Sequence, residues 1–478
     1  MAPKKKNILV ATIGTRDLAF QVSSGEWFNV GEYQSKDRVL IDLNLDKSVS
    51  HRELCELLLS CEEYQERLVP IILGKLIADE AKNLSRIYLI ATDQLEGVKQ
   101  RTSDTLYAAE IISRWIATKY AVPTTVFLQG SEGLNPSSFE QMFTWWQKIW
   151  EQIETQTPVF QMLIMAPKGG VGSSTEAARV SALSRFEQRV RFCDFTEDSA
   201  QNLLGYPSPY TVPTKGLNYL WDRKRKESIE LLDRYDYEAV KRLLKSYLPE
   251  PQFAEVRSAL DAAVCWNQGN FVGFAQAPGA MAEGRSNQWW WIGYEVAYLA
   301  MIRLNQSHTA EAMFHSFRSV EGTLKEYLLH SYPHHVVKEK KSVKVKQSIC
   351  RVSGLEKYAN KSNETPRFQR YPLILYSDNL TDLIQLARPD CTKNSDLQSY
   401  FGSTKNNRNV LFHGLEGLER KEVFENWGCD NLEGWENRVL GCLNFMTGEK
   451  FDRLQQASLM SAVHQVIVDG IANYRSEG

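Results

Sequence analysis

Residues 7–18 read NILVATIGTRDL, an apolar run that passes directly into small polar residues, a glycine and an arginine. A short apolar run that ends in such residues is typical of a β-strand followed by a loop. We therefore predict a strand over 7–14. Its carboxyl end would carry Thr12, Gly14, Thr15 and Arg16.

Four further runs have the same β-rich character and alternate with segments of helical period. The predicted strands are 38–45, 86–93, 124–130 and 159–167, and the helical segments between them include 51–81 and 102–121. Strands that alternate with helices indicate βαβ units, and hence a doubly wound, mostly parallel sheet with ligands at the carboxyl ends of its strands. The first part of the chain is therefore expected to be an α/β domain.

The pattern changes at GYPSPYTVPTKG, residues 205–216, where three prolines and two glycines disfavour regular structure. Beyond it the apolar residues recur at helical spacing almost to the end of the chain, which predicts an all-α domain. The predicted organisation is a first domain over 1–205, a linker over 206–220 and a helical domain over 221–478.

Composition limits the classes of function. The 478 residues include 56 Lys and Arg against 58 Asp and Glu, so a contact with RNA or DNA has to be local rather than a basic coat. The eight cysteines show no zinc spacing, and the start of the chain shows no signal peptide, which predicts a cytoplasmic protein without a metal site. The apolar runs are shorter than the roughly 20 residues of a membrane span, so no membrane contact is expected.

A second glycine loop, PKGGVGSST at 167–175, follows a predicted strand and precedes a helix. Backbone N–H groups in this context bind phosphate. The loop resembles the P-loop of partitioning ATPases, but Ser173 stands where the phosphate-binding lysine of that motif belongs. Three readings stay open: an ATP site, a purely structural glycine turn, and a loop that binds another phosphodiester, which we favour.

Three polar loops would then meet at one edge of the sheet, because the carboxyl ends of parallel strands share an edge. Small hydroxyls, glycine backbone and an arginine suit phosphate, and the polar groups after the third strand suit a base or ribose. The predicted ligand site comprises Thr12, Gly14, Thr15, Arg16, Asp17, Thr92, Asp93, Gln94, Lys168, Gly169, Gly170, Ser173 and Ser174.

These segments support a specific resemblance. ILVATIGTRD, IATDQ followed by SDTLYAAEII, and the GGVGSST loop resemble the CARF sensor domain of CRISPR-associated proteins. The helical half carries Arg408, Asn409 and His413 in the order R-N-x-x-x-H, and resembles the HEPN ribonuclease domain. Together they are similar to the effector ribonucleases of type III CRISPR systems, which act in antiviral defence. The fold implied is a Rossmann-like CARF domain followed by a helical HEPN domain.

The resemblance implies a single-strand RNA endoribonuclease, a homodimer with a composite active site, switched on by a cyclic oligoadenylate. We expect the tetra-adenylate as activator. The catalytic residues would be Arg408, Asn409 and His413, acting through the RNA 2′-OH without a metal or other cofactor. If 408–418 is helical, His413 lies on the face opposite an apolar stripe of leucines.

Two rival functions and one additional activity remain open at this point. The chain could be a CARF sensor whose helical half is an inactive docking module, or it could be a partitioning-type ATPase. The CARF half could also cleave its own activator, with Thr12, Arg16 or Ser173 positioning a ribose 2′-OH.

Overall fold

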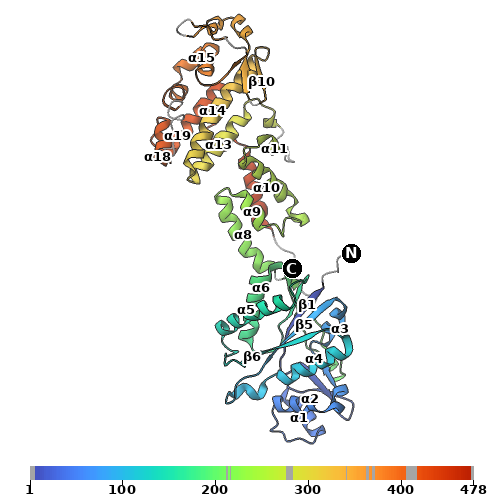
Figure 1. Cartoon of the computed structure of the whole chain (residues 1–478). Helices are drawn as coiled ribbons and strands as arrows, with labels where there is room; N and C mark the ends of the chain where they lie inside the picture. Colours follow the sequence, from blue (N-terminus) through green and yellow to red (C-terminus); the bar gives the residue numbers. More distant parts are fainter. Residues whose placement is uncertain are drawn as a thin grey trace. The chain divides into compact units, whose positions relative to one another are not determined.

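The structure, a computed structural model, is drawn in Figure 1. Its contacts divide the chain into two compact units, one ending at residue 222 and one covering 223–474. The division falls inside helix α8 (Leu217–Asp233). The residues described are 6–211, 214–215, 217–275, 284–340, 342–361, 365–368, 372–404 and 417–474.

The first unit is built on a six-stranded sheet, in the order β6-β5-β1-β7-β8-β9, whose first five strands are parallel. Strand β9 pairs antiparallel with β8 at the edge. The predicted parallel sheet is confirmed. The strands are β1 (Asn7–Thr12), β5 (Leu84–Thr92), β6 (Thr124–Gln129), β7 (Leu163–Ala166), β8 (Val190–Phe192) and β9 (Thr214–Lys215).

Strand β1 is the centre of this sheet and its topological switch point. The chain builds outward from β1 through β5 to β6, then returns to the other side of β1 and continues through β7 to β8. In a doubly wound sheet, two neighbouring strands flank this reversal of direction. The loops that follow them run to opposite faces of the sheet, and a crevice opens between the two loops. The loops after β1 and β7 are the two glycine loops singled out in the sequence.

The two faces of the sheet carry separate apolar cores, because successive side chains of a strand point to opposite faces. Leu9 and Ala11 belong to the core shared with α2 (His51–Ser60) and α4 (Leu106–Tyr120). Ile8 and Val10 belong to the core shared with α5 (Phe139–Gln156) and α6 (Gly172–Phe186). Figure 1 shows α4 on one side of the sheet and α5 with α6 on the other.

Two of the predicted elements are wrong. Residues 38–45 do not form a strand: helix α1 (Tyr33–Asp42) occupies most of this range, and it buries Val39 and Leu40 on one side while Ile41 is 62% exposed. The predicted helical segment 51–81 is interrupted by β4 (Leu68–Pro70). This strand extends a small antiparallel sheet, β3-β2-β4, with β2 (Leu18–Gln21) and β3 (Trp27–Asn29). Apolar runs this short do not distinguish a helix face from a buried strand.

The proline-rich segment 205–216 is held against the first unit where it is described. The backbone N–H of Ser208 donates to the carbonyl of Ile71 at 2.7 Å, and the Tyr210 hydroxyl donates to Asp79 Oδ2 at 3.1 Å. Strand β9 follows in the same segment. Proline removes donors from these residues, but it leaves them free to cross the edge of the sheet as an extended strap.

The second unit is mainly helical, in agreement with the predicted fold class. The long buried helices α13 and α14 pack against each other, and α19 packs on both. Its longer helices after α8 are α9 (Tyr237–Leu243), α10 (Ala254–Asn267), α13 (Trp291–Asn305), α14 (Thr309–Ser331), α15 (Ser377–Ala387), α18 (Arg420–Asn426), α19 (Leu432–Thr447) and α21 (Met460–Asn473).

Helices do not account for the whole second unit. A small antiparallel sheet in the order β10-β11-β12 follows α14. Its β10 and β11 pair antiparallel, and β11 alternates buried valines with more exposed residues, a period of two over only four residues that the neighbouring lysines obscure in the sequence. The strands are β10 (Val336–Glu339), β11 (Ser342–Val345) and β12 (Leu373–Ile374).

One carboxyl is fully buried among the helices. Glu295 of α13 accepts hydrogen bonds on Oε2 from Trp266 Nε1 at 2.8 Å and from Ser458 Oγ at 2.5 Å. Its Oε1 accepts from the backbone N–H of Leu459 at 2.7 Å. Burial raises the pKa of Glu295, and these three hydrogen bonds oppose the rise. The carboxyl therefore joins α10, α13 and the start of α21.

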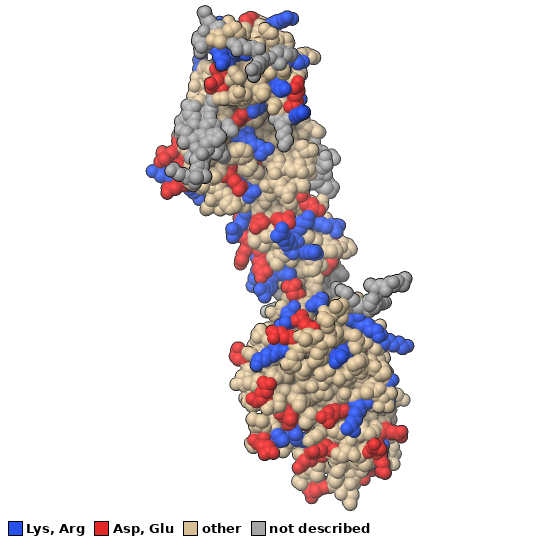
Figure 2. Space-filling view, viewed as in Figure 1, with Lys and Arg blue, Asp and Glu red and all other residues tan. Residues whose placement is uncertain are grey.

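Charges of both signs are interspersed on the face drawn in Figure 2, where the described residues form no broad basic surface. Among the described residues, no helix has an apolar stretch long enough to cross a bilayer.

Candidate functional site

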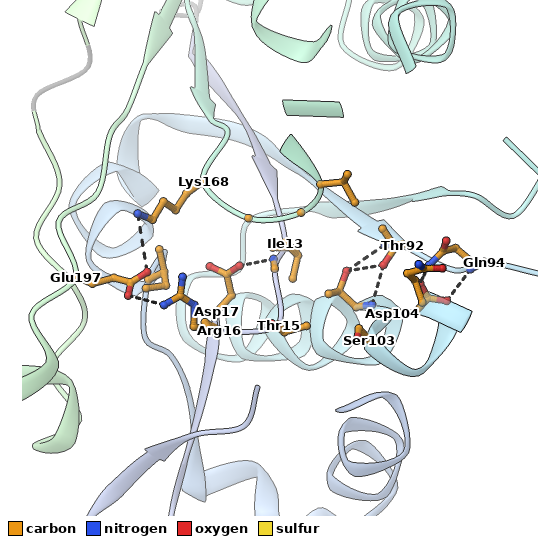
Figure 3. Close-up of a pocket in the computed structure, with 17 residues that line it drawn as sticks. Ile13, Thr15, Arg16, Asp17, Thr92, Gln94, Ser103, Asp104, Lys168 and Glu197 are labelled. Carbon is orange, nitrogen blue, oxygen red and sulfur yellow. Dashed lines mark hydrogen bonds and ion pairs between the residues drawn. The ribbon is translucent and has the colours of Figure 1, made fainter. Parts of the chain in front are cut away.

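A cavity of about 330 Å³ opens where the loops after β1, β5 and β7 meet at the carboxyl edge of the sheet (Figure 3). The three loops that the sequence assigned to one site do share this edge. The predicted residues that line the cavity are Gly14, Thr15, Arg16, Asp17, Thr92, Gln94, Lys168, Gly169 and Gly170.

The two glycine loops touch backbone to backbone. A Cβ added to Gly169 would lie 2.1 Å from the backbone nitrogen of Gly14, so no other residue fits at 169 without a shift of the chain. Gly170 has φ +88°, in the left-handed region that favours glycine. The floor of the cavity is therefore peptide backbone, which can approach a ligand closely.

Asp17 is a buried carboxyl at the base of the first loop. Its Oδ2 accepts a hydrogen bond from the Gly14 N–H at 2.5 Å, while Oδ1 is buried without a partner among the described residues. Burial raises the pKa of Asp17 to about 7; the Gly14 N–H, Lys168 and Arg16 oppose the rise, and the Glu197 carboxylate adds to it. Near neutral pH this group can be either charged or neutral.

Two cations enter the cavity from different loops and converge on one carboxylate. Arg16 Nη1 lies 3.1 Å from Glu197 Oε2, and Lys168 Nζ lies 3.9 Å from Glu197 Oε1 (Figure 3). The side chains of Arg16 and Lys168 are 55% and 37% exposed, so both remain accessible to a ligand.

The loop after β5 is held by the residues that precede α4. Asp104 is buried and accepts hydrogen bonds from the Gln94 backbone N–H at 2.6 Å and from Gln94 Nε2 at 3.0 Å. Thr92 and Thr105 bond reciprocally, each backbone N–H donating to the other's hydroxyl. The polar side chains of Thr92 and Gln94 are thus held in place on this wall of the cavity.

Four predicted residues do not line the cavity. Thr12 is buried beneath it, with Oγ1 unpartnered among the described residues. Asp93 turns to Arg52 Nη1, which donates to its Oδ1 at 2.7 Å. Ser174 is buried in the core, where its Oγ accepts from Gln129 Nε2 at 2.7 Å. Ser173 lies half-buried on the first turn of α6.

Eight lining residues were missed from the sequence: Ile13, Ile72, Gln100, Ser103, Asp104, Thr105, Val171 and Glu197. Asp104 could have been found, since it lies in the SDTLYAAEII segment that carries the CARF resemblance. Glu197 carried no such signal, because it follows β8, a strand of only three residues that the sequence does not predict.

The predicted catalytic residues Arg408, Asn409 and His413 lie outside the described residues, as do residues 408–416 of the predicted helix 408–418; its last two residues, 417 and 418, are described and are not helical. The described chain on either side of them is anchored to α14. The rings of Tyr400 and Phe317 lie 5.0 Å apart, and Thr309 Oγ1 donates to the Leu418 carbonyl at 2.5 Å. Among the described residues, no group of three or more His, Cys, Asp or Glu side chains could hold a metal ion.

Comparison with known proteins gives a match in structure. No family model matches the sequence, and no curated protein matches it. Csm6 of Enterococcus italicus, solved with bound cyclic hexa-2′-fluoro-hexa-dAMP, aligns with 98% of this chain and 100% of its own, with a TM-score of 0.62 and 13% identity. The alignment spans both units, so the resemblance to CARF–HEPN effectors is confirmed for the fold.

Proposed function

We propose that the chain is a single-strand RNA endoribonuclease of antiviral defence, switched on by cyclic oligoadenylate in the cytoplasm. One observation carries the proposal. A chain that shares the whole fold of Csm6 has a polar cavity with two cations at the switch point of its CARF-like sheet. This is the position at which doubly wound sheets bind their ligands.

The cavity has the groups that a ring of phosphodiesters and adenosines needs. Arg16 and Lys168 would neutralise phosphate oxygens, and the backbone of Gly169 and Gly170 would donate N–H groups beside them. Thr92 and Gln94 would contact a base or ribose. Thr12, Asp93, Ser173 and Ser174 would position these loops rather than touch the ligand.

Cleavage would use the nucleophile that RNA itself carries, the 2′-OH. His413 would take or give the proton, Arg408 would stabilise charge on the phosphorane, and Asn409 would orient one of them. The products would be a 2′,3′-cyclic phosphate and a 5′-OH, formed without a metal.

A homodimer connects the two activities. One arginine and one histidine are few groups for an active site. Two protomers would each contribute one such motif to a composite cleft. A cyclic oligoadenylate has rotational symmetry, so a two-fold pair of first units can grip it with duplicated loops. Its binding would favour the dimer arrangement in which the two motifs are correctly spaced.

The rival functions make different predictions. A partitioning-type ATPase would hydrolyse ATP, which the serine at position 173 disfavours. A sensor with an inactive helical half would bind activator without cutting RNA. Cleavage of the activator itself would appear as linear products when the protein and the ring are incubated without RNA.

The deciding experiment is to incubate the full chain with labelled RNA and EDTA, together with cyclic tri-, tetra- or hexa-adenylate. We expect cleavage with the tetra-adenylate. Cyclic hexa-adenylate is the other principal ligand to test, since Csm6 was solved with a cyclic hexanucleotide. Absence of cleavage with every ring, in EDTA and in Mg²⁺ alike, would refute the proposal.

A further inference from the structure

Both cations of the proposed phosphate site are already engaged by the same acidic side chain. Glu197 lies between Arg16 and Lys168 and offers one carboxylate oxygen to each, at 3.1 Å and 3.9 Å. The Glu197 side chain is 31% exposed. A carboxylate shared in this way occupies the two positive groups much as a phosphate would.

The backbone around Glu197 is fixed, so this placement does not depend on a loose loop. On one side the Thr196 N–H donates to the Pro209 carbonyl at 3.1 Å, and Phe195 forms a bridge with Tyr210. On the other side Asp198 caps α7 (Ser199–Leu203) by accepting from the Gln201 N–H at 3.2 Å. The carboxylate can swing on its side chain, but its Cα is held.

The Arg16–Glu197 pair also forms part of a wall between two cavities. A second cavity of about 180 Å³ is lined by Arg16, Ile72 and Glu197, which also line the first, together with Trp27, Asn29 and Asn202. A side chain that releases Arg16 can therefore turn toward this neighbouring space. Displacement of Glu197 needs no rearrangement of the core.

We propose that Glu197 is a resident competitor for the activator's phosphates, which has to yield Arg16 and Lys168 before a phosphodiester can bind them. The proposal rests on the activator site assigned above and adds a residue that sets its affinity. Each entering phosphate replaces an existing ion pair instead of adding one. A single phosphate therefore gains little binding free energy from Arg16 and Lys168. A cyclic oligonucleotide with several phosphates and bases gains binding free energy from its contacts elsewhere in the cavity.

The test is Glu197→Gln in the full chain, titrated calorimetrically with cyclic tetra-adenylate and with cyclic hexa-adenylate. Glutamine keeps the shape but removes the charge, so affinity should rise about three- to tenfold, the value expected of two half-exposed ion pairs. The affinity of Glu197→Gln should also fall more steeply with salt, because its complex forms new ion pairs.

The matched control is Asp194→Asn, which removes another carboxylate of the same segment. Asp194 pairs with Arg179 at 3.0 Å and does not line the cavity. The Asp194→Asn variant should therefore bind the cyclic oligoadenylates with the affinity of the wild type. Glu197→Ala provides a second variant for the case in which the glutamine retains a strong bond to Arg16. Equal or weaker binding by both Glu197 variants would overturn the proposal.

Failure of this inference can be separated from failure of the proposed function. If the wild-type chain bound no cyclic oligoadenylate, the proposed function would fail, and inorganic triphosphate would then be the probe. Tighter triphosphate binding by Glu197→Gln would still support competition for the two cations. Equal triphosphate binding by wild type and variant would overturn it.

Discussion

Asp17 in the first unit and Glu295 in the second are both fully buried carboxyls, and the difference between them distinguishes a site from a scaffold. Both oxygens of Glu295 accept hydrogen bonds, from three donors in all. Asp17 has one bonded oxygen and one without a partner among the described residues, at the floor of a cavity. Equal burial thus leaves every acceptor of the carboxyl satisfied in the helical unit, and leaves one acceptor unsatisfied beside the cavity of the first unit.

The largest effect should come from the proposed chemistry of the second unit, which would separate cleavage from binding. His413→Ala and Arg408→Ala should each lower RNA cleavage about 10²- to 10⁴-fold, the usual contribution of a proton-transferring or charge-stabilising group. Activator affinity should not change, because the proposed activator site lies in the first unit. Gel-based cleavage and calorimetric titration measure the two quantities.

Mixing the two variant chains tests whether the cleft is shared. A mixed dimer would keep one arginine and one histidine, so partial activity would show that single copies suffice in trans. Wild-type cleavage by both separate variants, with activator bound, would end the ribonuclease proposal.

Next in size is the stability of the helical unit. Glu295→Ala should lower its free energy of unfolding by about 3–5 kcal/mol, because three buried donors lose their acceptor. Asp17→Asn should instead raise stability, by an amount that grows as the pH rises from about 4 to about 7 and stays constant above that, because the wild-type carboxyl ionises in the unfolded chain well before it does in the folded one. Urea midpoints followed by circular dichroism would measure both. Equal losses for the two variants would erase the contrast drawn between these carboxyls.

A smaller effect is expected from the titration of Asp17. Its pKa of about 7 is raised, so the carboxyl is neutral below that pH and negative above it. Glu197, Arg16 and Lys168 face it across the cavity. Affinity for cyclic tetra-adenylate should fall as pH rises from 6 to 8, by about tenfold if the added charge acts at partly screened distance. Asp17→Asn should flatten the profile; an unchanged slope would exclude Asp17 as its source.

The smallest effect is expected from metal removal. Cleavage should continue in EDTA at the rate seen with Mg²⁺, because the 2′-OH mechanism uses a histidine and an arginine. Complete loss in the chelator, restored by Mn²⁺ or Mg²⁺, would indicate a metal nuclease instead.

The sequence predicted the sheet and the edge at which the loops meet, because apolar runs and glycine loops are local signals. It placed Ser174 in the site because the residue follows the glycines. The structure turns this hydroxyl inward to Gln129. No signal in the sequence indicated Glu197, because the position of this residue depends on the segment 205–215 that returns along β8. Contacts between segments distant in the chain leave no periodic trace, and these decide which polar side chains face the cavity.

Glu295 also has a consequence for the order of events during protein synthesis. Its partners Ser458 and Leu459 lie 163 and 164 residues later in the chain. At a ribosomal rate of about 5–20 residues per second, roughly 8 to 33 seconds separate the carboxylate from its partners. The nascent first unit can fold in that time, while the Glu295 carboxylate of α13 still lacks two of its three hydrogen-bond donors. Because its buried hydrogen bonds form late, the helical unit should be the part of the nascent chain that most needs protection from aggregation.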